Sequence, residues 1–90
     1  MDISDYRRFS DFFNALSHPI RVEIVLELLD GKKCVTDIGE LLGVRQPNVS
    51  QHLAVLKSNN IVDWHQEGKM KCYFLKNPER MRNILKVLKK

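Results

Sequence analysis

Residues 35–62 read VTDIGELLGVRQPNVSQHLAVLKSNNIV, and this stretch decides the fold because it predicts two helices joined by a tight turn. Thr36 is suited to cap the first helix, and Gly43 is suited to end it in a left-handed conformation. After the turn at residues 43–46, Pro47 fits the first position of a second helix, where its missing N–H costs no hydrogen bond. The stretch therefore predicts a helix-turn-helix.

The apolar residues of this stretch recur three and four positions apart, which places them on one face of each helix. They are Ile38, Leu41 and Leu42 on the first helix and Val49, Leu53 and Leu56 on the second. The opposite face of the second helix is small and polar. An ordinary solvated helix surface is richer in Lys and Glu, whereas the charged residue between Gln46 and Asn60 is Lys57 alone.

Amide and hydroxyl side chains suit the edges of DNA bases. Gln and Asn can pair with adenine through two hydrogen bonds, and Ser can bind a base or a phosphate. We therefore predict that the second helix is a recognition helix that enters the major groove. The residues expected to contact DNA from this region are Arg45, Gln46, Asn48, Ser50, Gln51 and His52.

The segment after this helix predicts a β-hairpin. Residues 61–65 and 70–75 are strand-like, and residues 66–69 contain the glycine that a tight hairpin turn needs. A hairpin directly after a recognition helix forms a wing. Lys69 and Lys71 would then meet the phosphate backbone, which fixes orientation without reading sequence.

Charge is distributed unevenly along the chain. Residues 1–44 hold 5 Lys or Arg against 8 Asp or Glu, whereas residues 45–90 hold 10 against 3, so the net charges are −3 and +7 and the total is +4. Positive charge thus gathers on the half with the recognition helix and wing. Such asymmetry is typical of a protein that binds a polyanion.

Length and composition predict a single domain over residues 1–90. The N-terminus resembles no signal peptide, and no apolar run approaches the roughly 20 residues needed to cross a bilayer. We expect no membrane partner and no cofactor. Two cysteines without an export signal indicate a reducing cytoplasm rather than a disulfide scaffold.

Three further helices complete the predicted fold. The segment 19–30 has one narrow polar stripe and should lie in the middle of the domain. The terminal helices 5–16, which Ser4 can cap, and 78–89, which starts at Asn77 and Pro78, carry more apolar surface than a minimal winged domain needs. We predict that they pair across a two-fold axis, although they could instead cap the core of their own chain. The candidate dimer residues are Phe9, Phe12, Phe13, Ile84, Leu85 and Leu88. The expected fold is mainly α with a β-hairpin wing, in the order of four helices, two strands and one helix.

Several motifs resemble those of the ArsR/SmtB transcriptional repressors over nearly the whole chain. They are ALSHPIR at residues 15–21, VTDI at 35–38, QPNVSQHL at 46–53 with Val55 and Leu56, EGK at 67–69, and Tyr73. The resemblance implies a homodimeric winged-helix repressor that binds a palindromic operator and leaves it when an effector arrives. It also places Ser50, Gln51 and His52 where such repressors touch DNA, although a structural role for His52 stays open.

The sequence departs from this family at the positions that bind metals. Metal-sensing members carry Cys-Val-Cys before the recognition helix, whereas residues 34–36 here read Cys-Val-Thr. Zinc-sensing members place His and carboxylate ligands on the last helix, which here holds Glu79 and no histidine. Neither metal site of the family is intact, so we predict no metal site.

The two cysteines are the remaining effector candidates. Lys32 and Lys33 precede Cys34 and a helix N-terminus follows it, and both features favour the reactive thiolate. Cys72 shares a strand face with Met70 and Phe74, which predicts burial and low reactivity. A thiol switch and a purely structural role both remain open, and joining the two residues would require Cα atoms within about 7 Å.

Other function classes fit less well. The chain has no glycine-rich phosphate loop and no Cys or Ser with an identifiable base, so we expect no enzyme. A winged-helix module that binds proteins, and a repressor with a non-standard metal site, remain alternatives. The predicted function is a sequence-specific DNA-binding repressor, acting as a homodimer in the cytoplasm and released by an unidentified, thiol-directed signal.

Overall fold

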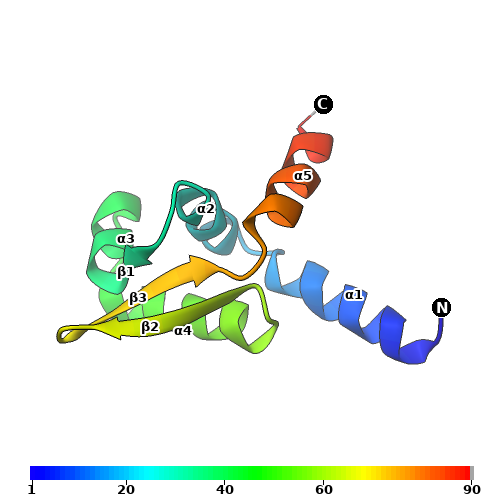
Figure 1. The fold of residues 1–90 in the computed structure, drawn as a ribbon, viewed down its shortest axis with the longest axis horizontal. Coiled ribbons are helices and arrows are strands. Elements are labelled where there is room, and N and C mark those ends of the chain that lie inside the picture. Colours follow the sequence, from blue (N-terminus) through cyan, green and yellow to red (C-terminus); the bar gives the residue numbers. More distant parts are fainter. Residues whose placement is uncertain (90) are drawn as a thin grey trace.

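The computed structural model describes residues 1–89, which form five helices and three short strands (Figure 1). The elements are α1 (Ile3–Ala15), α2 (Pro19–Leu28), β1 (Lys33–Cys34), α3 (Val35–Leu42), α4 (Gln46–Ser58), β2 (Val62–Glu67), β3 (Met70–Leu75) and α5 (Pro78–Leu88). This arrangement confirms the predicted winged helix-turn-helix. Among the described residues, no helix is long and apolar enough to cross a membrane.

Helices α3 and α4 pack against each other through most of the predicted apolar residues, but Leu41, which was expected on the shared face, is 57% exposed. Ile38, Val49 and Leu53 are fully buried between them. Gly43 ends α3 with φ +66°, a conformation that glycine adopts without strain. At Gly39 an added Cβ would lie 3.0 Å from the carbonyl oxygen of Val44, so a glycine allows the turn to approach α3 closely.

The helix starts differ from the prediction in detail. Cys34, not Thr36, occupies the cap position of α3, and it makes no side-chain capping bond. Thr36 lies inside the first turn of α3 and directs its hydroxyl to the sulfur of Met70, 3.9 Å away. Helix α4 begins one residue before Pro47, at Gln46. Pro47 nevertheless stays within the first turn, where its missing N–H is harmless.

The sheet has three antiparallel strands in the order β1-β3-β2. The sequence predicted only the β2-β3 hairpin and not the additional strand β1. Strand β1 was not expected because its two residues are too short for a periodic pattern. It pairs with β3 through Lys33 opposite Tyr73 and Cys34 opposite Cys72. The hairpin turn is also tighter than predicted, because β2 runs on to Glu67 before Gly68 turns with φ +60°.

Helix α2 supplies the centre of the core, as its narrow polar stripe predicts. Ile24, Val25 and Leu28 are almost completely buried. The core cluster continues into α3, α4 and one face of the sheet, and its other members are Ala15, Val35, Ile38, Val49, Leu53, Leu56, Ile61, Val62, Tyr73, Leu75 and Met81. The shared core thus fixes the position and orientation of the recognition helix relative to the wing.

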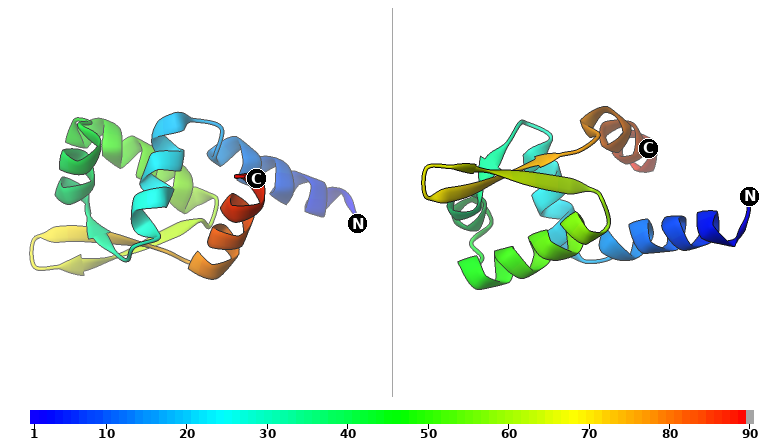
Figure 2. Two further views of the ribbon diagram at one scale, coloured as in Figure 1. Left: turned by 90° about the horizontal axis from the view of Figure 1, so that it is seen from above. Right: turned by 60° about the horizontal axis from the view of Figure 1, so that its bottom comes forward.

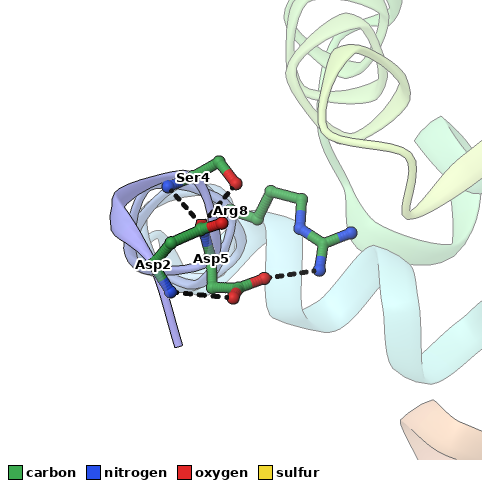
Figure 3. Close-up of polar contacts among 4 residues, drawn as sticks. All are labelled: Asp2, Ser4, Asp5 and Arg8. Atoms are coloured by element: carbon green, nitrogen blue, oxygen red, sulfur yellow. Dashed lines mark hydrogen bonds and ion pairs between the residues drawn. The ribbon is translucent and has the colours of Figure 1, made fainter.

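The terminal helices project from the end of the molecule opposite the tip of the hairpin (Figure 2). Helix α1 begins at Ile3, earlier than predicted, and Asp2 rather than Ser4 caps it. The Asp2 carboxylate accepts hydrogen bonds from the Ser4 and Asp5 backbone N–H groups, and Asp5 bonds back to the Asp2 N–H (Figure 3). Asn77 caps α5 as predicted.

Candidate nucleic-acid interface and cysteine cluster

The first turns of α4 present the polar side chains expected to read DNA. Val49, Leu53 and Leu56 are fully buried and fix the orientation of the helix about its axis. The residues on the opposite face and at the N-terminal end of the helix are exposed: Arg45, Gln46, Asn48, Ser50 and Gln51. They form what we call the reading face. No side chain caps the N-terminus of α4, and the Asn48 and Val49 backbone N–H groups donate instead to the Arg45 carbonyl oxygen.

The hairpin places two lysines at the same end of the molecule as the start of α4. The hairpin tip and the first turn of α4 both lie at the end remote from α1 and α5 (Figure 2). Lys69 is exposed in the turn. Lys71 is exposed on β3, and its Nζ lies 4.3 Å from the centroid of the Trp64 ring. This cation–π contact holds the ammonium group against the surface of the hairpin.

His52 is directed away from the reading face. Its ring centroid lies 4.4 Å from that of His18, and its Nδ1 lies 3.4 Å from the Arg21 guanidinium. Burial lowers the pKa of His52, and the neighbouring His18 and Arg21 lower it further. These contacts favour the structural role that the sequence left open, because a half-buried, neutral α4 ring that packs against His18 and Arg21 is poorly placed to reach a base.

The two cysteines are joined. Cys34 and Cys72 form a disulfide between β1 and β3, with Cα atoms 3.7 Å apart. The sequence left open whether the two cysteines lie close enough to join, and the structure places them within that distance. The physical reason is the register, which sets the two residues directly opposite each other on neighbouring strands. Cys72 is fully buried, as strand alternation predicts.

The Glu67 carboxylate lies beside the disulfide and contacts two further side chains. The Glu67 carboxylate accepts hydrogen bonds from Lys32 Nζ and from the His65 ring. These two hydrogen bonds hold the pKa of Glu67 below its usual range. One Glu67 oxygen and the two sulfurs all lie within 4.8 Å of one another. We call Cys34, Cys72, Glu67 and His65 the wing-base cluster.

Glu67 and His65 were not expected to have a function, because residues 66–69 were predicted to form the hairpin turn. The signal that could have found them is the two-residue period of a strand. His65 pairs directly with Cys72, and Glu67 follows His65 by two residues, so all three side chains lie on one face of the sheet. Extending the predicted strand from residue 65 to Glu67 would have placed Glu67 on the same face as His65.

The terminal helices expose apolar side chains at the end remote from the wing. Phe9 is 44% exposed, Phe13 66% and Leu88 74%. Phe12, Ile84 and Leu85 are half-buried, and Phe12 and Leu85 also pack against the core. Helices α1 and α5 and the end of α4 together line a groove of about 560 Å³. Some of the predicted interface residues therefore pack against the core of their own chain, and the others are exposed to solvent.

The amino-acid sequence of the chain is similar to those of known transcriptional regulators. Residues 18–63 match the family described as "Bacterial regulatory protein, arsR family". The chain is 38% identical to the HTH-type transcriptional repressor SmtB of Mycobacterium tuberculosis over 65 residues, which are 72% of this chain and 48% of that protein. It thus spans about half the length of that relative.

Two further comparisons cover more of the partner protein. The arsenical resistance operon repressor of Bacillus subtilis is 35% identical over 80 residues, covering 88% of this chain and 75% of that repressor. Among solved structures, HlyU from Vibrio cholerae superimposes with a TM-score of 0.85 at 25% identity, over 97% of each chain. The shared region includes the helix-turn-helix and the wing.

Proposed function

This chain belongs to the arsR family of bacterial regulatory proteins, a family of transcriptional regulators, and on that premise we propose that it is a sequence-specific DNA-binding repressor. The observation that carries the proposal is the common placement of the reading face and the wing lysines. Exposed amides on α4 and exposed cations on the hairpin lie at one end of a rigid core. The amides can read base edges while the lysines bind phosphates.

The residues divide by role. Gln46, Asn48, Ser50 and Gln51 read bases in the major groove, and Arg45, Lys69 and Lys71 bind the phosphate backbone. His52 acts by packing α4 against α2, since its ring contacts His18 and Arg21. The protein needs no catalytic group for this activity, and its site of action is the cytoplasm, where chromosomal DNA lies.

The repressor acts as a homodimer through α1 and α5. Large apolar side chains such as Phe13 and Leu88 are otherwise left in water at the end of the molecule that does not face DNA. Pairing two copies there about a two-fold axis buries these side chains and directs two reading faces at two half-sites. A palindromic operator with half-sites roughly one helical turn apart is the expected target.

The release signal is thiol chemistry at Cys34 and Cys72. The disulfide joins the start of α3, one half of the helix-turn-helix, to β3, the strand that carries Lys71. Closing it takes two electrons and two protons from the thiols, and a peroxide or a disulfide of a small thiol accepts them. The disulfide therefore links the helix-turn-helix to the wing in the oxidised state and not in the reduced state.

The experiment that tests the repressor proposal begins with selection of a binding sequence from a pool of random duplexes. Fluorescence anisotropy then compares the selected duplex with a scrambled duplex of equal length and composition. We expect tighter binding to the selected duplex, and a linear fall of log affinity with log salt through counterion release. Equal affinity for the two duplexes, or a response that is flat in salt, would overturn the proposal and favour a protein-binding module.

A further inference from the structure

We propose that the wing-base cluster, once its disulfide is reduced, binds a thiophilic divalent cation such as Zn²⁺ or Cd²⁺ through the sulfurs of Cys34 and Cys72 and the carboxylate of Glu67. This site shares only Cys34 with the positions at which relatives in the family are expected to carry metal ligands. It is independent of whether the chain represses transcription, because it rests on side chains that do not belong to the reading face.

The distances suit one small ion. The two sulfurs and one Glu67 oxygen already lie within 4.8 Å of one another. Ligands at about 2.3 Å for sulfur and about 2.0 Å for oxygen, arranged tetrahedrally, stand roughly 3.5–3.8 Å apart. Small side-chain rotations are therefore enough to bring the three donors around a cation once the sulfurs part.

The backbone holds these donors in place without a long loop. Cys34, Cys72 and His65 lie in one row across the three strands, since Cys34 pairs with Cys72 and Cys72 pairs with His65. Neighbours in such a row project from the same face of the sheet. Glu67 follows on that face, and its hydrogen bond with His65 orients the carboxylate. A histidine that supports a ligand in this way commonly strengthens metal binding.

The donor set selects the class of metal. Two thiolates favour Zn²⁺ and softer cations over Mg²⁺ or Ca²⁺, which prefer oxygen. The Glu67 side chain is 39% exposed, so a cation can enter from solvent and a water can complete its coordination. Lys32 competes for the same carboxylate and must leave Glu67 when the cation arrives.

Binding and disulfide formation exclude each other because they use the same sulfurs. Two molecules of a thiol reductant convert the disulfide to two protein thiols and become a disulfide themselves. The cation then displaces one proton from each thiol and binds the two resulting thiolates. The oxidised chain therefore lacks the site, and a bound cation protects both sulfurs from oxidation.

Metal titration of the full chain tests this site directly. Chain reduced with a phosphine and kept anaerobic is titrated with Cd²⁺, and thiolate-to-metal charge-transfer absorption is recorded; Zn²⁺ affinity comes from competition with a chromophoric chelator. We expect one cation per chain, and no charge-transfer band in the oxidised chain. Absence of binding by the reduced chain, or equal binding by the oxidised chain, would overturn the proposal.

Variants assign the ligands. Cys72→Ser should abolish the one-to-one complex, and thermal unfolding shows whether this variant keeps its fold. Glu67→Gln lies at the surface and keeps the two thiols, so it isolates the carboxylate. It should weaken Zn²⁺ binding by at least roughly 10-fold, because loss of a group that only supports a ligand already costs about 10–100-fold. Glu79→Gln, an exposed carboxylate on α5, is the matched control and should bind as the wild type does. An unchanged affinity in Glu67→Gln would refute the three-ligand site.

Discussion

The imidazole rings of His18 and His52 lie 4.4 Å apart, centroid to centroid, at the junction of α2 and the recognition helix. His18 caps α2, since its Nδ1 accepts a hydrogen bond from the Ile20 N–H at 3.1 Å. Arg21 contacts the His52 ring and also donates to the Ala15 carbonyl at 2.6 Å. These residues connect the end of α1, the start of α2 and the middle of α4. A positive charge on His52 would therefore weaken the packing among these three helices.

The first prediction concerns pH. Burial and the neighbouring His18 and Arg21 lower the pKa of His52 in the folded chain. As the pH falls below the unfolded value of about 6.5, the unfolded chain takes up this proton first, so the free energy of unfolding decreases until the pH reaches the lowered folded pKa. Above about pH 6.5 the contribution of His52 is constant. Urea unfolding at several pH values measures the slope.

The matched variants for this test are His52→Gln and Gln51→Ala. The first removes the half-buried titrating ring and should flatten the fall of stability below about pH 6.5. The second removes an exposed side chain that does not titrate, from the same helix, and should leave that part of the slope in place. An identical slope in His52→Gln and the wild type would contradict the assignment.

The second prediction separates base reading from phosphate binding. Gln51→Ala should reduce the preference for the selected duplex over the scrambled one by about 1–3 kcal/mol, because it removes a base contact. Lys69→Ala should weaken binding to both duplexes by a similar factor and lower the salt dependence, because it removes a phosphate contact. Anisotropy on the two duplexes distinguishes these outcomes. Equal losses on both duplexes for both variants would remove Gln51 from base reading.

The third prediction concerns the dimer. Phe13 is 66% exposed on α1, so Phe13→Glu should leave the fold intact and place a charge in the proposed interface. We expect dimerisation to weaken by about 2 kcal/mol or more, as at an aromatic anchor of an interface. Sedimentation over a concentration series measures this change. Leu41→Glu is the control, since Leu41 is 57% exposed on α3, away from α1 and α5, and this variant should dimerise normally.

The fourth prediction concerns the core beneath the recognition helix. Leu53 is fully buried, so Leu53→Ala should lower the free energy of unfolding by about 2–5 kcal/mol through lost burial and a cavity. Gln51, two residues earlier on the same helix, is exposed. Gln51→Ala should therefore change stability by less than about 0.5 kcal/mol. Denaturant unfolding compares them, and similar losses would mean that the helix is oriented differently.

The fifth prediction concerns the proposed redox signal. The DNA affinity of the wild type should differ between the reduced and oxidised states by about 5–150-fold, the usual range for coupling between two sites. Cys34→Ser cannot close the disulfide, so its affinity should match that of the reduced wild type under both conditions. Binding to the selected duplex with and without oxidant, in the absence of metal, measures this. A redox response that persists in Cys34→Ser would place the switch elsewhere.

Local patterns predicted most of the fold. The apolar spacing of Val49, Leu53 and Leu56 oriented the recognition helix correctly, because a helix buries whatever recurs every three or four residues. Gly43 and Asn77 marked helix ends correctly because their backbone and side-chain preferences act over a few residues. Capping by Ser4 and Thr36 was wrong, because Asp2 starts α1 two residues earlier and Cys34 starts α3 without any side-chain capping bond.

The amino-acid sequence by itself determined the helix-turn-helix, the hairpin, the reading face and the basic wing, since each depends on short-range periodicity, turn residues or local charge. Tertiary structure decided the pairing of Cys34 with Cys72, the position of Glu67 beside them and the inward direction of His52. Cys34 and Cys72 are 38 residues apart. Whether such distant residues meet depends on the register of β1 against β3, which follows from how the whole core packs and not from any local pattern.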